Sequence, residues 1–504
     1  MRWSLARAAV AAATTTAALG ALCAPVPSTA QAAATSHATV ARTAFEVPTR
    51  ARGSRPNVMM ITVDDAAPGD LRFLPKTRKL LGESGTTLTN AIAPTPLCAP
   101  ARASLLTGKY AHNHGTLSIS GKNGGLGALD SERNTLPVWL QAAGYDTLFV
   151  GKYLNGYGEG ASRATYVPPG WTDWRATIGK TTYNYMGHRI NLNGKPRKFR
   201  GDYSTTVLGA QADDMLTAPR RTSKPWYLWL NYVAPHHGGP DDADDPTVTH
   251  PRFRPAVQTA RPAKKYRNTL RRLALPRKPN MFASTRGVDW SGAGRSLLRE
   301  AYQQRGEALR SVDDAIAKHV RILKRTGMWK QTVVIFASDN GYSVGEHNHL
   351  GKNVYWREET TVPTIITGPG VPSGITTKNV ISQLDLVASI VEAAGATPGR
   401  SLDGEPAWDL LAPGETEVRT VGIEAWPVRY GGLRANFTGV RKGDRWTYVR
   451  MRSGREFLYD HDSDPYELRN LRRSEDPAVQ EVLAQVRADT DRLSRCDGAD
   501  CRDR

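Results

Sequence analysis

The chain has 504 residues, of which 40% are hydrophobic and 23% are charged, and this is enough to bury a large core and form two or three domains. Its formal net charge of +19 favours polyanionic partners. The basic residues are nevertheless spread along the chain without a recognisable nucleic-acid-binding module, so we predict no nucleic-acid partner. A solvated basic surface is the simpler interpretation of the charge, and attraction to polyanions is the second.

The first 32 residues are predicted to be a signal peptide. Arg2 and Arg7 make the start positive, Ala8–Leu22 is a run of apolar and small residues, and Ala30-Gln31-Ala32 has the Ala-x-Ala pattern of a cleavage site. A membrane anchor is the alternative, but the run is short and rich in alanine for a span. We therefore expect a secreted, extracellular protein without a membrane span, cleaved near Ala32 and followed by a linker at 33–54. Removal of Arg2 and Arg7 lowers the formal net charge from +19 to +17.

Short apolar runs rich in β-branched and aromatic residues predict buried strands, and helical stretches alternate with them. The predicted strands are Asn57–Val63, Thr147–Val150, Trp226–Leu230 and Thr332–Ser338, and the predicted helices include Thr135–Ala143 and Leu297–Thr326. This alternation predicts an α/β sandwich with a largely parallel sheet. Ligands of such sheets bind beyond the carboxyl ends of the strands, so we expect one pocket at that edge.

Polar residues follow the predicted strands and suit a metal site. Asp64 and Asp65 follow the first strand, and Asp339 and Asn340 follow the last. Hard oxygen ligands of this kind favour Ca²⁺ or Mg²⁺ over a zinc site with soft ligands. Two aspartates after a strand are, taken alone, more often a solvated turn or a helix cap. The equivalent position of Asp339 and Asn340 favours the metal site.

A cysteine motif follows the first predicted strand. Cys98-x-Pro100-x-Arg102 is followed by Leu-x-Thr-Gly, and a helix is predicted to begin near Pro100, a favourable first helical position. Arg102 would then lie on the same side as Cys98, and the helix N-terminus would stabilise negative charge there. A buried structural thiol is one interpretation of Cys98. An odd cysteine in an exported chain, however, calls for another explanation.

The C-terminal part predicts a smaller α+β unit. Its predicted strands are Phe437–Arg441, Trp446–Arg450 and Glu456–Asp460, and a final helix is predicted at Pro477–Leu493. We place the larger domain at 55–400 and the smaller one at 401–504. Cys496 and Cys501 are close enough in sequence to pair, which an exported protein permits, but the sequence leaves this pairing open.

The complete motif around Cys98 resembles the signature of the sulfatase family, and the resemblance spans about Arg55 to Leu471. It implies an alkaline-phosphatase-like α/β/α sandwich with a large mixed, mostly parallel sheet. It also implies a smaller C-terminal domain with a four-stranded antiparallel sheet and a helix. In this family a formylglycine-generating enzyme oxidises the motif cysteine to formylglycine during maturation, and the hydrate of that aldehyde is the nucleophile.

The resemblance also implies the roles of individual residues. Cys98 would be modified to formylglycine, and Arg102 would hold the hydrate. Lys152 and Lys352 would bind the sulfate, and His236 would protonate the leaving alcohol. Calcium is expected in preference to magnesium. Its ligands would be Asp64, Asp65, Asp339, Asn340 and the modified Cys98.

One position departs from the common family pattern. Many sulfatases have Gly-Lys-Trp-His-Leu-Gly after the corresponding strand, where the histidine contacts formylglycine, whereas this chain has Leu154 in that place. The form Gly-Lys-Tyr-Leu-Asn, ending at Asn155, resembles the glucosamine-6-sulfatase branch, which includes extracellular heparan-sulfate enzymes. His114 is then a candidate base for sulfate release, with a packed structural histidine as an equal alternative. His237 is the second choice to His236 as proton donor.

The sequence therefore predicts a secreted sulfatase, a sulfuric ester hydrolase acting on sulfated carbohydrates of the glucosamine-6-sulfate type or on aryl sulfates. A phosphoesterase or phosphonate hydrolase of the same fold is the alternative among enzymes. A non-catalytic polyanion-binding protein is the alternative from another class, and intact Cys98, Lys152 and Lys352 speak against it.

Overall fold

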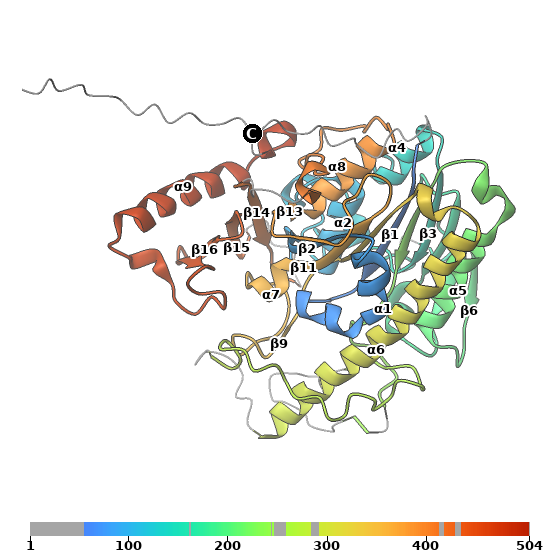
Figure 1. The fold of residues 1–504 in the computed structure, drawn as a ribbon, viewed down its shortest axis with the longest axis horizontal. Helices are drawn as coiled ribbons and strands as arrows, with labels where there is room; N and C mark the ends of the chain where they lie inside the picture. The colour runs from blue at the N-terminus through green and yellow to red at the C-terminus, as the bar shows by residue number, and fades with distance from the viewer. Residues whose placement is uncertain are drawn as a thin grey trace, which may run out of the picture. The chain divides into compact units, whose positions relative to one another are not determined.

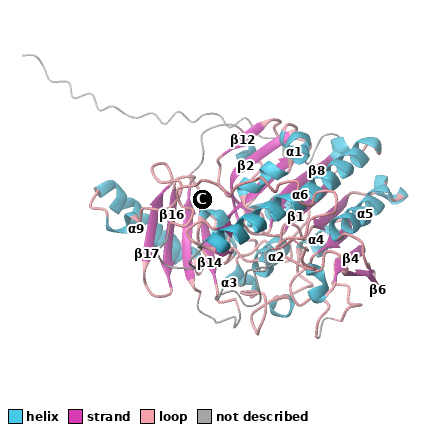
Figure 2. Cartoon of the chain, turned by 90° about the horizontal axis from the view of Figure 1, so that it is seen from below, coloured by secondary structure: helices cyan, strands magenta, loops and turns pink. Residues whose placement is uncertain are grey.

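The computed structural model describes residues 55–160, 163–242, 244–245, 259–283, 292–412, 418–428 and 435–502 (Figure 1). The predicted signal peptide at 1–32 and the predicted linker at 33–54 lie outside these residues. Within the described ranges, no helix is long and apolar enough to cross a membrane. Helices and strands alternate along most of the chain (Figure 2).

The larger sheet contains all four strands predicted from the sequence. They are β1 (Asn57–Val63), β3 (Asp146–Gly151), β7 (Trp226–Asn231) and β8 (Thr332–Ser338). β1 pairs in parallel with both β7 and β8, and β3 pairs in parallel with β7. The carboxyl ends of these strands therefore lie at one edge, as the expected pocket requires.

The remaining strands make the larger sheet mixed. They are β2 (Gly85–Ile92), β4 (Asp173–Thr177), β5 (Arg189–Leu192), β6 (Lys195–Lys198), β11 (Thr361–Thr367), β12 (Ile375–Thr377) and β13 (Ile381–Ser382). The strand order is β12-β2-β11-β8-β1-β7-β3-β4-β5-β6, and β13 pairs with β2. β11 runs antiparallel to both β2 and β8, and β4, β5 and β6 form antiparallel pairs at the far edge. The predicted mixed, mostly parallel sheet is confirmed.

Helices cover both faces of this sheet (Figure 1). Alternate residues of β1 explain why: Val58 and Met60 belong to one hydrophobic core, and Met59 and Ile61 belong to the other. The first core also contains residues of α2 (Cys98–Thr107), α4 (Leu136–Ala142) and α8 (Gln383–Ala393), and the second contains residues of α5 (Ser204–Thr217) and α6 (Gly292–Arg325). The predicted α/β/α sandwich is confirmed. Short helices complete the set: α1 (Pro75–Thr77), α3 (Ala111–His114) and α7 (Arg357–Thr360).

The helix of the cysteine motif begins earlier than predicted. α2 starts at Cys98, after the extended residue Leu97, whereas the sequence predicted a start near Pro100. Proline fits here because the first-turn N–H groups of a helix have no partner within it. The predicted helix Leu297–Thr326 likewise begins earlier, at Gly292 in α6, and ends at Arg325.

The C-terminal part forms a four-stranded antiparallel sheet with a helix, as predicted. Its strands are β14 (Thr420–Ala425), β15 (Phe437–Lys442), β16 (Trp446–Met451) and β17 (Glu456–Asp460), in that order. α9 (Pro477–Leu493) packs on this sheet through Leu483 and Val486, which share a core with Val440 and Tyr448. A further two-stranded sheet pairs β9 (Ser343–Val344) with β10 (Leu350–Gly351).

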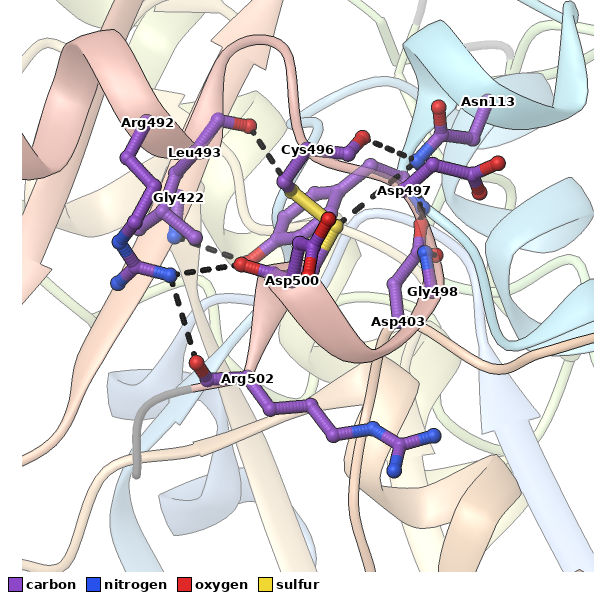
Figure 3. The surroundings of a disulfide bond; sticks show 12 residues. Asn113, Asp403, Gly422, Arg492, Leu493, Cys496, Asp497, Gly498, Asp500 and Arg502 are labelled. Atoms are coloured by element: carbon purple, nitrogen blue, oxygen red, sulfur yellow. Dashed lines mark hydrogen bonds between the residues drawn. A yellow bond between two sulfur atoms is a disulfide. The ribbon is translucent and has the colours of Figure 1, made fainter.

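Cys496 and Cys501 form a disulfide, which resolves the pairing that the sequence left open (Figure 3). The loop closed by this bond contacts α3, because Asn113 Nδ2 donates to the Cys496 carbonyl at 2.9 Å. Asp403 accepts from the Gly498 amide at 2.8 Å and from Asn113 Nδ2 at 2.8 Å. Within the described part of the chain, Cys98 is the free cysteine, and it is buried.

Candidate active site

The predicted site residues lie together at the carboxyl edge of the larger sheet. Asp64 and Asp65 follow β1, and Asp339 and Asn340 follow β8. The ligand oxygens of Asp64, Asp65 and Asp339 all lie within 4.8 Å of one another. The parallel register of β1 and β8 causes this, since it places Val63 opposite Ser338, directly before the two acidic pairs.

Several oxygens of this cluster have no hydrogen-bond partner. They are Asp64 Oδ1, Asp65 Oδ2 and Asn340 Oδ1, and all three residues are fully buried. Burying a charged oxygen is costly unless a cation or a donor compensates it. Burial, followed by the neighbouring Asp64, raises the pKa of Asp339, so a cation would favour its ionised form. The donor set therefore fits a hard cation such as Ca²⁺ or Mg²⁺.

Three cations surround these carboxylates, of which Arg102 and Lys152 are buried and Lys352 is partly buried. Lys152 Nζ lies 2.5 Å from Asp64 Oδ2, Lys352 pairs with Asp65, and Arg102 Nε lies 2.8 Å from Asp339 Oδ2. Burial alone would lower the pKa of Lys152, but Asp64 and Cys98 outweigh it and raise the pKa above its ordinary value. The pKa of Lys352 is raised for the same reasons, with Asp65 as the main partner. Both ammonium groups therefore remain charged inside the site.

Cys98 occupies the first turn of α2, beside these charges. Its side chain is buried, and its Sγ donates to Asn155 Oδ1 at 3.4 Å. Arg102, one helical turn later, is fixed from three sides, because besides Asp339 it donates to the Lys152 carbonyl at 2.9 Å and to Asn231 Oδ1 at 2.8 Å. The helix N-terminus also favours negative charge at Cys98.

His236 borders the same cluster. Its Nε2 lies 3.6 Å from Asp65 Oδ2, and its Nδ1 bonds to the His237 carbonyl at 2.7 Å. This second bond makes Nδ1 the protonated nitrogen of the neutral ring and turns Nε2 toward the site. Burial, and then the neighbouring His237, lower the pKa of His236 well below its ordinary value. Ligand atoms of His237, His236 and Asp65 lie within 4.8 Å of one another, so both predicted histidines border the cluster.

Asn155 and Tyr183 are site residues that the sequence analysis did not assign. Asn155 accepts from Cys98 and donates from Nδ2 to the Tyr183 hydroxyl at 3.2 Å. The Tyr183 ring lies 4.6 Å from that of His236 and 5.1 Å from Lys152 Nζ. Leu154, at the place of the family histidine, is instead buried in the hydrophobic core. Asn155 could have been found from its position next to Leu154, and Tyr183 belongs to the string Tyr183-Asn184-Tyr185, which resembles the same branch but gives Tyr183 no role by itself.

His114 makes contacts typical of a structural histidine. Its Nε2 lies 3.2 Å from Ser104 Oγ, and its Nδ1 accepts from the Thr116 amide at 3.2 Å. It is fully buried, and burial, followed by the charge of His112, lowers its pKa to about 3. Both ring nitrogens therefore bond to α2 and the loop after α3, rather than to Cys98.

Comparison with known proteins agrees with this geometry. The sulfatase family profile matches residues 56–396. N-acetylglucosamine-6-sulfatase of Capra hircus is 29% identical, over 90% of this chain and 86% of the relative. A protein named "Extracellular sulfatase SULF-1 homolog" of Drosophila melanogaster is 29% identical over 76% of this chain, which spans 34% of that longer relative.

A solved structure shares the fold at low sequence identity. It is described as a complex with its substrate D-glucosamine-2-N,6-O-disulfate, and it matches with a TM-score of 0.71 at 18% identity, covering 89% of this chain and 99% of that one. The fold is therefore that of the alkaline-phosphatase-like class, an α/β/α sandwich with a mixed, mostly parallel sheet. Because the family profile covers more than half of the sequence, the chain belongs to the sulfatase family, and it is a sulfuric ester hydrolase.

Proposed function

We propose that this sulfatase is an exported enzyme that removes sulfate from sugars of the glucosamine-6-sulfate type, with aryl sulfates as simpler substrates. One observation carries the proposal: Cys98 lies at the start of α2 within a buried cluster of acids and cations built from four separate parts of the chain. The names of the relatives from Capra hircus and Drosophila melanogaster support the sugar substrate and the extracellular location.

The metal of this enzyme is proposed to be calcium, held by Asp64, Asp65, Asp339, Asn340 and the modified Cys98. The unpartnered oxygens of Asp64, Asp65 and Asn340 support this assignment. Calcium is preferred to magnesium by family resemblance. When bound, such a cation lowers the pKa of a hydroxyl group that it contacts and neutralises charge on the sulfate.

Cys98 is proposed to be converted to formylglycine by a formylglycine-generating enzyme. The modification would supply an aldehyde hydrate, of which one hydroxyl group would attack the sulfur and the other would allow sulfate to leave as the aldehyde re-forms. Arg102 supports this role because its guanidinium is fixed one turn after Cys98 and keeps Nη2 without a hydrogen bond. Asn155 accepts a hydrogen bond at the same position and would orient the modified side chain.

Lys152, Lys352 and His236 are proposed to act on the sulfate and the leaving alcohol. The two lysines place positive charge beside Cys98, where the oxygens of a bound sulfate would need it. His236 presents Nε2 toward the same cluster; this nitrogen carries no proton in the neutral ring, so it would first take up a proton and then pass it to the departing oxygen. The base for sulfate release is left unassigned, because Leu154 is buried and His114 bonds elsewhere.

The domain division and the export signal are part of the same proposal. We propose a catalytic domain at 55–400, a smaller C-terminal domain at 401–504 and cleavage of a signal peptide near Ala32. The Cys496–Cys501 disulfide supports an oxidising location. N-terminal sequencing of the secreted protein would test the cleavage site, since mature protein beginning at Met1 would contradict it.

Substrate choice is tested with defined sugars sulfated at the 6-, 4- or 2-position, measuring free sulfate and the desulfated product. A primary 6-sulfate is sterically open and should be released fastest. Matched aryl sulfate and aryl phosphate esters measure the preference for sulfur over phosphorus. Release only from a ring secondary position would overturn the glucosamine-6-sulfate proposal and leave the family assignment intact.

A further inference from the structure

A cavity of about 190 Å³ opens beside the catalytic cluster, on the side of β3 and β4. Catalytic residues form one wall, since Lys152, Asn155 and Tyr183 line it, and Thr182 and Lys180 continue it outward. Glu159 is the acidic residue among those that line it. The cavity therefore leads from the reacting centre toward an exposed cation, Lys180.

The surface beyond this cavity is basic, and its acids lie at the margins, with Glu159 in the cavity and Asp202 after Arg200. No aspartate or glutamate occurs from Trp174 to Gly201. Within the described residues, no carboxylate pairs with the cations of this stretch that lie beyond the cavity. We call Lys180, Arg189, Lys198 and Arg200 together the basic track.

The residues of the basic track lie on consecutive elements that lead from the cavity to the edge of the larger sheet. The turn Gly179–Tyr183 is followed by β5, whose Arg189 amide donates to Thr181 Oγ1 at 3.1 Å. Arg189 and Lys198 are directly opposite each other in the β5–β6 hairpin. β6 is the outermost strand of the larger sheet, three strands from β3, or about 14 Å at ordinary strand spacing (Figure 2).

The pairing of Arg189 with Lys198 is unfavourable without a bound anion. Residues directly opposite in an antiparallel pair project from the same face of the sheet, and like charges there destabilise the pair. Lysines on an exposed edge strand also discourage pairing between two copies of a protein. That role does not account for Lys180 and Arg189, which lie outside the edge strand. An anion that bridges Arg189 and Lys198 accounts for the facing pair, and Lys180 lies between that pair and the cavity.

We propose that the basic track binds a linear, multiply sulfated polysaccharide whose reacting sugar occupies the active site. This inference rests on the proposed function and extends it from a single sulfated sugar to a polyanionic chain. Arg189 and Lys198 contact sulfate groups on sugars beyond the one that is hydrolysed, and Lys180 contacts the sugar next to it. Arginine suits this task because its planar guanidinium matches tetrahedral oxyanions with paired donors.

The test compares two triple variants of the full secreted protein. The track variant carries Arg189→Gln, Lys198→Gln and Arg200→Gln. The control variant carries Arg321→Gln, Arg325→Gln and Lys330→Gln, which remove the same charge from the end of α6 and the turn before β8, an inner strand six positions from β6. Binding to heparin is measured between 50 and 300 mM salt, and KM is measured for sulfated oligosaccharides of increasing length.

The track variant should bind heparin more weakly, and its slope of log affinity against log salt should fall by up to about one for each cation removed. Its KM should rise about tenfold for long oligosaccharides and much less for a monosaccharide ester. The control variant should behave like the wild type in both assays. Lys180→Gln, measured separately, should raise KM already for a disaccharide.

The outcomes separate the two proposals. Equal loss of heparin binding in both triple variants, or unchanged binding in the track variant, would overturn the basic track while leaving sulfatase activity as it is. The proposal would also be overturned in favour of nucleic acid if the wild type bound duplex DNA more tightly than heparin and only the track variant lost this DNA binding. A selective loss of heparin binding in a protein that releases no sulfate from any ester would support the track and refute the proposed function.

Discussion

At the scale of single residues, the active site is a balance of buried charges. Asp64, Asp65 and Asp339 are matched by Lys152, Lys352 and Arg102, and all six are held within one buried cluster. Breaking a buried pair by removing one partner leaves a charge without compensation, which is strongly destabilising. Tests of catalytic roles should therefore begin with residues that can change without altering this balance.

Cys98→Ala is such a change, because it removes the proposed nucleophile and leaves every ion pair in place. Turnover should be abolished while the melting temperature remains close to that of the wild type. In wild-type protein from a competent host, the peptide containing Cys98 should have the mass of an aldehyde side chain in place of a thiol. Active enzyme whose Cys98 is entirely an alkylatable thiol would contradict the formylglycine proposal.

Asn155→Leu tests the contact between Cys98 and its hydrogen-bond partner. Leucine has a similar shape but cannot accept from the nucleophile, so kcat should fall about a hundredfold with a smaller change in KM. Tyr183→Phe is the matched control, because it affects the hydrogen bond made by the amide nitrogen of Asn155. It removes only the hydroxyl that receives the Asn155 Nδ2 bond and should lower kcat less. Equal kcat in wild type and Asn155→Leu would show that Asn155 has no part in positioning Cys98.

At the scale of elements, polar contacts join the helices near the active site to the C-terminal sheet. His112, in α3, lies with Nδ1 2.7 Å from Glu424 of β14, and its Nε2 bonds to the Cys496 carbonyl at 3.1 Å. One side chain therefore links α3, the second sheet and the disulfide loop. Such contacts hold the C-terminal strands against the elements that follow α2.

Because of His112, we expect the unfolding free energy of the protein to depend on pH. Burial opposes its charge, but Glu424 outweighs burial and raises the pKa to about 9, above the ordinary value of 6.5. Because the folded-state pKa is the higher one, the stabilisation is complete below pH 6.5 and is lost as the pH rises through 9. Between pH 6 and pH 10, wild type should lose about 2–3 kcal/mol more unfolding free energy than His112→Gln. Denaturation at both pH values measures this difference, and parallel losses in the two proteins would contradict it.

At the scale of the whole molecule, the proposed metal connects strands that are far apart in the sequence. Its candidate ligands follow β1 and β8, which are separated by more than 250 residues along the chain and are neighbours in the sheet. A cation bound only by the folded protein stabilises it by mass action. Metal content should therefore affect both activity and the stability of the entire larger domain.

Removal of divalent cations should eliminate sulfate release and lower the melting temperature, and added calcium should restore both. Asp339→Asn should weaken metal binding severely, because it removes one of three buried carboxylates that converge on the site. Calorimetric titration with calcium measures this binding directly, and the melting shift on adding calcium should be small in the variant. Full activity after exhaustive chelation, with elemental analysis showing no metal, would refute the role of the cation.

The sequence by itself determined the elements and the chemistry of this protein. The runs at Asn57–Val63 and Thr332–Ser338 are mostly apolar on both faces of the strand, so their burial on both faces could be read locally. The acids after them predicted a metal site by residue type and position, and the role of Cys98 was implied by the resemblance of its motif to that of sulfatases. The short apolar runs of the other predicted strands and the length of α9 are also local properties, which is why these elements were predicted well.

Only the tertiary structure decided which partners meet. β11 inserts antiparallel between β2 and β8, Asn155 rather than Leu154 faces Cys98, and Lys352 pairs with Asp65 across 287 residues. Local patterns report how much of a residue is buried, but they carry no information on the distant element that buries it. The direction of a side chain at the end of a strand depends on packing from the whole sheet, and so the contacts that make these residues a site exist only in the folded chain.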